Sequence, residues 1–126
     1  MKTVIHTPSA PAAIGPYSQA ILSNGFLYTS GQIALNPDSG DLVMDNIEME
    51  CHQVMKNLKE VLAAAEMTFG NVVKTTIYLS SMSLYSDVNR VYAEYFESDP
   101  PAREAVQVAG LPKGVNVEIS LVACEF

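Results

Sequence analysis

The chain is short of charge, and of positive charge most of all. Charged residues make up only 17% of the 126 residues, and 7 lysines and arginines stand against 14 acidic residues, which gives a formal net charge of −7. A field of this sign repels phosphate backbones and anionic membranes unless the basic residues cluster, and the lysines are scattered along the chain. We therefore expect neither a nucleic acid nor a membrane as partner.

Cysteines are also few, and long apolar runs are missing. Cys51 and Cys124 lie far apart and neither belongs to a CxxC pair, so we expect two buried thiols and no metal site. No segment approaches the roughly 18 apolar residues that span a bilayer. The first residues also lack the apolar core of a secretory signal. These features together favour a reduced, cytoplasmic, soluble protein.

Apolar residues, in contrast, are abundant at 48% of the chain. A length of 126 residues suits one core and leaves no room for a second, so residues 1–126 are expected to form a single domain. So lightly charged a chain leaves apolar surface exposed, and we expect a partner to cover it.

Hydrophobic periodicity predicts alternating strands and helices. Asn24-Gly25 favours a hairpin that pairs residues 17–23 with 26–33. Asp45 followed by Glu48 resembles a capping box, and an apolar stripe follows it through residues 47–65. A second helix should begin at Ser83 and end before the prolines at 100 and 101. The remaining strands are expected at residues 2–7, 72–81, 103–109 and 115–124.

This order predicts an α+β fold in which two helices cover one face of a mixed sheet of about six strands. The other face needs water or a neighbouring chain. Alternation along "VNVEISLVA" turns Glu118 away from the helices, and alternation along "REAVQVA" groups Arg103 with Ala105 and Gln107. We expect Arg103 and Glu118 to share one cleft on the uncovered face. The alternative is an ordinary salt bridge between neighbouring strands.

Five segments resemble the RidA (YjgF-type) family of reactive-intermediate deaminases: "APAAIGPYSQA", "YTSGQI", "VVKTTIYL", "PAREAVQVAGLPKG" and "VEISLVA". The resemblance implies a chorismate-mutase-like fold and a homotrimer with clefts between subunits. It also implies hydrolysis of short 2-imino acids, such as 2-iminobutanoate and 2-iminopropanoate, to 2-oxo acids and ammonia. No metal and no organic cofactor takes part in the implied reaction.

The same resemblance implies the roles of individual residues. The arginine of the family's "PAR" motif falls on Arg103, whose planar fork suits a substrate carboxylate. The glutamate of the last strand falls on Glu118, which would orient a water and shuttle its proton. Tyr17 is the third residue implied in catalysis. The positions implied in substrate binding are Ser30, Gly31, Asn89 and Ala105.

The sequence departs from the family at positions 104, 105 and 120. Relatives often read "PARSCVEVARLPKD", whereas this chain has Glu104-Ala105, and Ser120 replaces a glutamate. A thiol role at position 105 is thereby excluded, but a backbone role is not. Three alternatives stay open: a non-catalytic trimer that senses 2-oxo acids, a ribonuclease or translation inhibitor, and a chorismate mutase. The charge of −7 disfavours the ribonuclease or translation inhibitor. A chorismate mutase binds a dicarboxylate, for which a single pocket arginine is insufficient.

Overall fold

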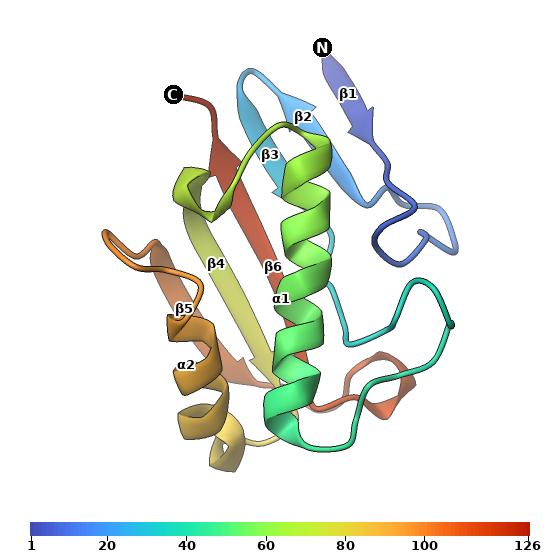
Figure 1. Ribbon diagram of the computed structural model, residues 1–126, viewed down its shortest axis with the longest axis vertical. Helices are drawn as coiled ribbons and strands as arrows, with labels where there is room; N and C mark the ends of the chain where they lie inside the picture. Colours follow the sequence, from blue (N-terminus) through green and yellow to red (C-terminus); the bar gives the residue numbers. More distant parts are fainter.

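The computed structural model describes residues 1–126. Its strands and helices follow one another along the chain in the order shown in Figure 1. The strands are β1 (Lys2–Ile5), β2 (Ala20–Ser23), β3 (Phe26–Thr29), β4 (Val72–Leu79), β5 (Ala102–Gln107) and β6 (Val117–Cys124). The α-helices are α1 (Ile47–Ala64) and α2 (Tyr85–Ala93). Three single turns of 3₁₀ helix, η1 (Phe69–Asn71), η2 (Met82–Leu84) and η3 (Pro112–Gly114), join them.

The six strands form one mixed sheet in the order β1-β2-β3-β6-β4-β5. Every pair is antiparallel except β4 and β5, which run parallel and are joined through α2. Parallel neighbours need such a crossover because a tight turn can only reverse the chain. The expected α+β architecture is confirmed, and β5 lies at an open edge of the sheet.

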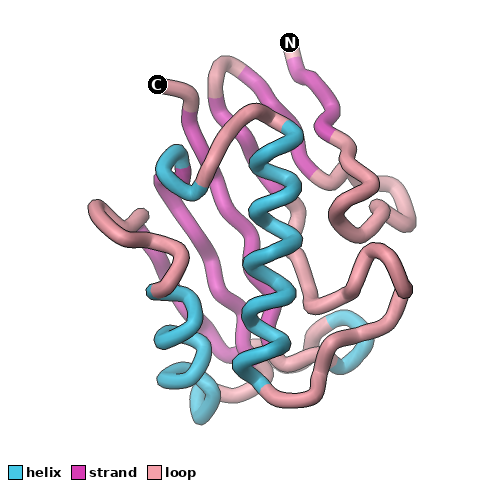
Figure 2. Tube along the Cα trace, in the orientation of Figure 1, coloured by secondary structure: helices cyan, strands magenta, loops and turns pink.

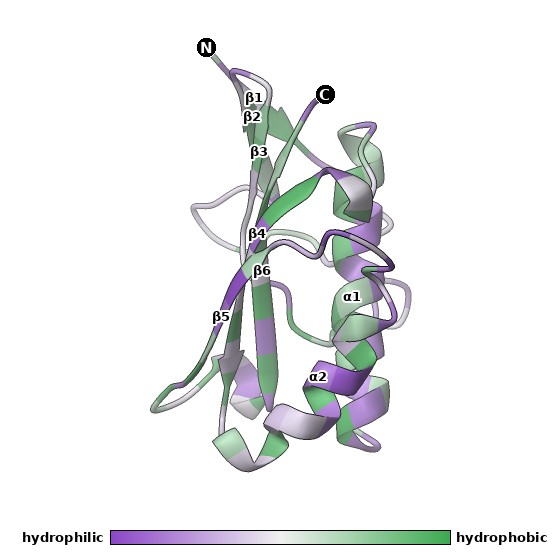
Figure 3. Ribbon diagram, turned by 90° about the vertical axis from the view of Figure 1, so that its left-hand side faces the viewer, coloured by the Kyte–Doolittle hydropathy of each residue, from purple (hydrophilic) through white to green (hydrophobic).

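Both helices pack on the same face of the sheet, and Figure 3 shows the other face uncovered. The face that the helices cover carries the core. Along β6 the alternation is strict, and its odd-numbered residues are buried beneath the helices, as the pattern predicts. They are Val117, Ile119, Leu121 and Ala123. The apolar stripe of α1 lies against them, so one continuous core joins helix and sheet.

The helix starts differ from prediction by one or two residues. The side chain of Asn46, not Asp45, caps α1, and its Oδ1 accepts from Met49 N at 2.8 Å. At the second helix, Ser81 rather than Ser83 provides the cap. The 3₁₀ turn η2 precedes α2, so the first N–H groups without a backbone partner belong to η2, and Ser81 Oγ accepts from Ser83 N. Asp, Asn and Ser all make good caps, so neighbouring candidates are hard to separate by sequence.

The hairpin forms at the expected place, with Asn24 at φ 52° and Gly25 at φ 80°. Two positive φ values match the twist of the flanking strands. Each strand has four residues, so both are shorter than predicted. The segment before β2 is irregular, as Figure 2 shows in pink, and the buried Gln19 side chain holds it by bonding backbone groups of Thr7, Ala10 and Pro11.

The cysteine prediction holds for one residue of the two. Cys51 is fully buried in the core, where burial raises the pKa of its thiol to about 12, and Cys124 near the end of the chain is only half-buried. Neither helix is sufficiently long and apolar to cross a bilayer.

Candidate functional site

Arg103 lies on β5 with its side chain turned towards α2. Its Nη1 donates to Asn89 Oδ1 and its Nη2 to the hydroxyl of Tyr85, both at 2.7 Å. Tyr85 and Asn89 stand one turn apart on α2, so both face the same strand. The two ends of the guanidinium fork are thus held by two neutral acceptors.

Aromatic rings flank the same guanidinium. Its Cζ lies 5.6 Å from the ring centroid of Tyr85 and 5.0 Å from that of Tyr92, within the range of cation–π attraction. The Tyr92 hydroxyl is 2.7 Å from Thr75 Oγ1 in the core, which fixes the ring. Burial raises the pKa of Tyr92, so this residue stays neutral beside the cation. We call Arg103, Tyr85, Asn89 and Tyr92 the arginine cluster.

The arginine cluster contains no negative charge. The ion pairs of the chain involve His52, Lys74 and Arg90, and none involves Arg103. A guanidinium has more N–H donors than the two used here, so some are left to bind a ligand. Small-molecule sites typically have volumes of about 300–1,000 Å³. A cavity of about 450 Å³ opens beside Arg103, between α2 and the prolines before β5. This chemistry suits a small anion.

Ala105 adds a backbone donor next to Arg103. Its side chain packs against the core, opposite Ile77 of β4. Val108 N donates to Leu79 O of β4, and backbone groups alternate in direction along a strand. The N–H of Ala105 therefore faces the open edge of the sheet, where no strand of the same chain accepts it.

Glu118 lies on β6 and points from the uncovered face, as predicted. Its neighbour across the sheet is Tyr78 of β4. A cavity of about 370 Å³ surrounds it, which we call the glutamate cavity. The other residues lining this cavity are Thr29, Gly31, Tyr78, Val108, Gly110, Leu111, Pro112 and Ser120. Partial burial raises the pKa of Glu118 above its usual 4.5, because the charged form loses water. A carboxyl tuned in this way suits proton transfer.

The backbone of Gly31 lies against that carboxylate. A Cβ placed on Gly31 would overlap Glu118 Oε2 and lie 2.7 Å from its carboxyl carbon. Only glycine fits here without moving the carboxylate, which gives the predicted site residue Gly31 a physical role.

Tyr17 and Ser30 lie on segments that meet near the start of β2. Ser30 Oγ donates to Ser18 O at 2.6 Å, and Ser30 N donates to Gln19 O at 2.9 Å. Ser30 directly precedes Gly31, so these two hydrogen bonds join the loop that carries Tyr17 to the segment that carries Gly31. The Tyr17 side chain is exposed, and it is not among the hydrogen-bond partners of Arg103.

The expectation of one shared cleft for Arg103 and Glu118 is wrong for a single subunit. Arg103 stands opposite Thr75, which is buried under the helices, whereas Glu118 stands opposite Tyr78 on the uncovered face. Strand β4 also separates β5 from β6. The two side chains leave opposite faces of the sheet, so the alternative of a salt bridge between neighbouring strands is wrong as well.

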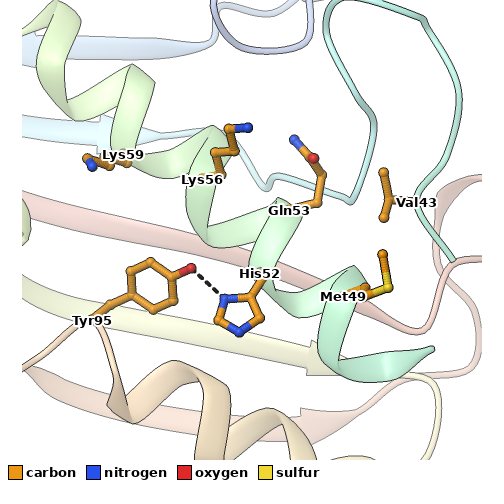
Figure 4. A pocket seen from close by; sticks show the side chains of 7 residues that line it. All are labelled: Val43, Met49, His52, Gln53, Lys56, Lys59 and Tyr95. Atoms are coloured by element: carbon orange, nitrogen blue, oxygen red, sulfur yellow. Dashed lines mark hydrogen bonds between the residues drawn. The ribbon is translucent and has the colours of Figure 1, made fainter. Parts of the chain in front are cut away.

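Another cavity, of about 460 Å³, lies away from all of these residues. Figure 4 shows it on the outer side of α1, where Tyr95 and His52 are joined by a hydrogen bond of 2.7 Å. The side chains of Lys56 and Lys59 point away from His52 in this view. The two lysines therefore do not converge with the His52–Tyr95 pair on one point, in contrast to the arginine cluster.

Comparison with known proteins settles the family. The family model described as endoribonuclease L-PSP matches residues 7–125. The chain belongs to this family, which is the YjgF/RidA family. The human 2-iminobutanoate/2-iminopropanoate deaminase is 49% identical over 125 residues, which are 99% of this chain and 91% of the human protein.

Two solved structures of the YjgF/RidA fold agree closely with this one. A Yersinia pestis protein of the Rid family superposes with a TM-score of 0.97 at 52% identity, covering 99% of this chain and all of its own. E. coli TdcF with bound serine superposes with a TM-score of 0.94 at 32% identity, covering 98% of this chain and 99% of its own.

Asn89 is a predicted site residue, whereas Tyr85 and Tyr92 are partners of Arg103 that the sequence analysis does not name. The spacing of residues 85, 89 and 92 on one predicted helix was the available signal, since these positions share a helix face.

Proposed function

We propose that this chain hydrolyses short 2-imino acids, such as 2-iminobutanoate and 2-iminopropanoate, to 2-oxo acids and ammonia. The observation that carries the proposal is an arginine held by neutral partners in a chain 49% identical to a deaminase of that name. A carboxylate is the one charge that every 2-imino acid carries at neutral pH. The related TdcF binds serine, another small carboxylate.

The site is proposed to be shared between two copies of the chain. Arg103 and Glu118 leave opposite faces of one sheet, so they can act on one substrate only if they come from different subunits. An interface that joins two different surfaces of the chain is heterologous, and such contacts form a ring when the rotation between subunits closes. The family resemblance favours a trimer as the size of this ring.

Exposed apolar side chains support this assembly. Several lie on the uncovered face of the sheet, where water would otherwise contact them. They are Val4, Phe26, Tyr28 and Val106. Sedimentation equilibrium should give a trimer at micromolar concentration, and a monomer there would contradict the shared site.

In the proposed reaction, Arg103 and the N–H of Ala105 bind the substrate carboxylate, with Asn89 bracing the guanidinium. Glu118 of a second copy orients a water in the glutamate cavity. As the water oxygen bonds to the imine carbon, Glu118 takes a proton from the water and passes it to the imine nitrogen, which gives a carbinolamine. Glu118 then moves the proton of the carbinolamine hydroxyl to the amino group, the C–N bond breaks to release ammonia, and the C–O bond becomes the carbonyl of the 2-oxo acid.

Tyr17 and Ser30 are proposed to line the same pocket from the side of Gly31. The hydrogen bonds of Ser30 to Ser18 and Gln19 support this, because they join the loop that carries Tyr17 to the segment that carries Gly31, and Gly31 lines the glutamate cavity.

The test is an assay in which a pyridoxal-phosphate dehydratase releases 2-aminoacrylate or 2-aminocrotonate. Adding this protein should speed the appearance of the 2-oxo acid, and Glu118→Gln should not. No acceleration by the unaltered protein would overturn the proposal. Cleavage of RNA under the same conditions would favour the endoribonuclease after which the family model is named, although a net charge of −7 opposes RNA binding.

A further inference from the structure

The hydroxyl of Tyr85 is the part of the arginine cluster to which the proposed chemistry gives no role. We propose that Tyr85 is a positioning residue, which aims the Arg103 fork at the substrate carboxylate. This inference rests on the proposed function of Arg103 as the carboxylate anchor.

Geometry favours Tyr85 over the other ring beside the arginine. The Tyr92 hydroxyl is taken up by Thr75 in the core, so Tyr92 offers Arg103 only the face of its ring. Tyr85 offers both a ring and an acceptor, 2.7 Å from Nη2. An arginine has several rotatable bonds, and bonds to both terminal nitrogens are needed to fix the plane of its fork. Asn89 supplies one of these bonds and Tyr85 the other.

The helix that carries Tyr85 is itself tied to β5. Gln107 Oε1, on the same face of β5 as Arg103, accepts from Met82 N at 2.8 Å. Met82 belongs to η2, which leads directly into Tyr85. The strand and the start of α2 are thus joined at both Arg103 and Gln107, so the Tyr85 hydroxyl has a defined place relative to the arginine.

Neutral acceptors orient the guanidinium without cancelling its charge. A carboxylate at the place of the Tyr85 hydroxyl would pair with Arg103 and compete with the substrate for it. Arg90 illustrates that case, because Asp87 and Glu48 lie 3.0 and 3.5 Å from its Nη2. Tyr85 therefore determines where the charge points and leaves its magnitude intact.

Tyr85→Phe tests the inference, since it removes the acceptor and keeps the ring. The KM for 2-iminobutanoate and the inhibition constant of the product 2-oxobutanoate should both rise about 5- to 10-fold, with kcat changed less than about twofold. Tyr95→Phe is the matched control, because its hydroxyl bonds His52 far from Arg103, and it should change neither constant. Unchanged constants in Tyr85→Phe would overturn the inference.

A second variant separates positioning from a merely structural role. In an Arg103→Lys background no fork remains to be aimed, so Tyr85→Phe should have almost no further effect. An equal effect in both backgrounds would show that Tyr85 does not act through Arg103 and would overturn the inference. If Arg103→Lys alone kept full activity, the proposed function of Arg103 would fail instead.

An NMR measurement tests the positioning role of Tyr85 without substrate turnover. The Nη signals of Arg103 should show slow rotation of the guanidinium in the unaltered protein, and faster rotation in Tyr85→Phe. Equal rotation in the two proteins would overturn the inference, whatever their thermal midpoints.

Discussion

The arginine cluster stabilises the charged form of its central residue, whereas the glutamate cavity disfavours the charged form of Glu118. Arg103 is surrounded by neutral acceptors and aromatic rings, which stabilise its charge and leave it without a counter-ion. Glu118 lies in a cavity where partial burial raises its pKa, so its charged form is disfavoured. The first environment suits holding an anion, and the second suits a group that takes up and releases a proton. Under the proposed function, substrate binding falls to one face of the sheet and proton transfer to the other.

The largest expected effect comes from Arg103→Lys, which keeps the charge and removes the fork. If Arg103 binds a carboxylate through two donors, kcat/KM for 2-iminobutanoate should fall at least about 30-fold, or about 2 kcal/mol. The thermal midpoint should stay the same, because the side chain faces a cavity. Arg90→Lys is the control and should leave activity unchanged, since Arg90 is exposed and paired with acids. Full activity of Arg103→Lys would remove the carboxylate anchor.

Gly31→Ala tests the other side of the comparison. The added Cβ should push the Glu118 carboxylate out of place and lower kcat about 10-fold, with a smaller change in KM, because the water loses its base. Gly110→Ala is a matched control, since Gly110 lines the same cavity and a Cβ there meets nothing within 4 Å. Equal activity of the two variants would show that the position of Glu118 is not critical.

Mixed assemblies test whether the two regions act across subunits. Arg103→Lys and Glu118→Gln should each be nearly inactive, yet refolding them together in equal amounts should restore roughly a quarter of the activity. Random mixing makes half of the arginine clusters and half of the glutamate cavities intact, and a quarter of the sites then combine two intact parts. No recovery would place both residues in the site of one chain.

The smallest effect is on stability. The folded state raises the pKa of Glu118, so ionisation of this group lowers the free energy of unfolding at a pH above that pKa. Below about pH 4.5 the carboxyl is protonated in both the folded and the unfolded state, and this loss disappears. Glu118→Gln should therefore raise the free energy of unfolding at pH 7, by less than about 1 kcal/mol since the group is partly exposed. The gain should disappear as the pH falls below 4.5. Urea unfolding at pH 7 and pH 4 measures both values, and equal gains at the two pH values would contradict the assignment.

The raised pKa of Glu118 also predicts how activity falls on the acid side of the pH profile. A general base must be ionised, so kcat/KM should fall as the pH drops through the pKa of Glu118, and the midpoint should lie above 4.5. A midpoint at or below 4.5 would show that another group controls this fall.

Much of the fold follows from local pattern. Alternation along residues 117–123 placed the core face of β6 and the opposite direction of Glu118, and both are confirmed. Asn24-Gly25 placed the hairpin, since few other pairs adopt two positive φ values. In each of these cases neighbouring residues alone contain the physical signal.

Only the tertiary structure decided how the functional side chains meet. Both faces of β5 are mixed, with Ala105 beside Arg103 on one and Val106 beside Glu104 on the other, so alternation alone does not say which face the helices cover. Parallel pairing with β4 decides it, because this register sets Arg103 opposite the buried Thr75. The contact between Gly31 and Glu118 likewise joins residues far apart in the chain. Sequence alone thus determined the elements and the candidate residues, whereas strand pairing determined which face each residue serves, because register depends on contacts between distant segments.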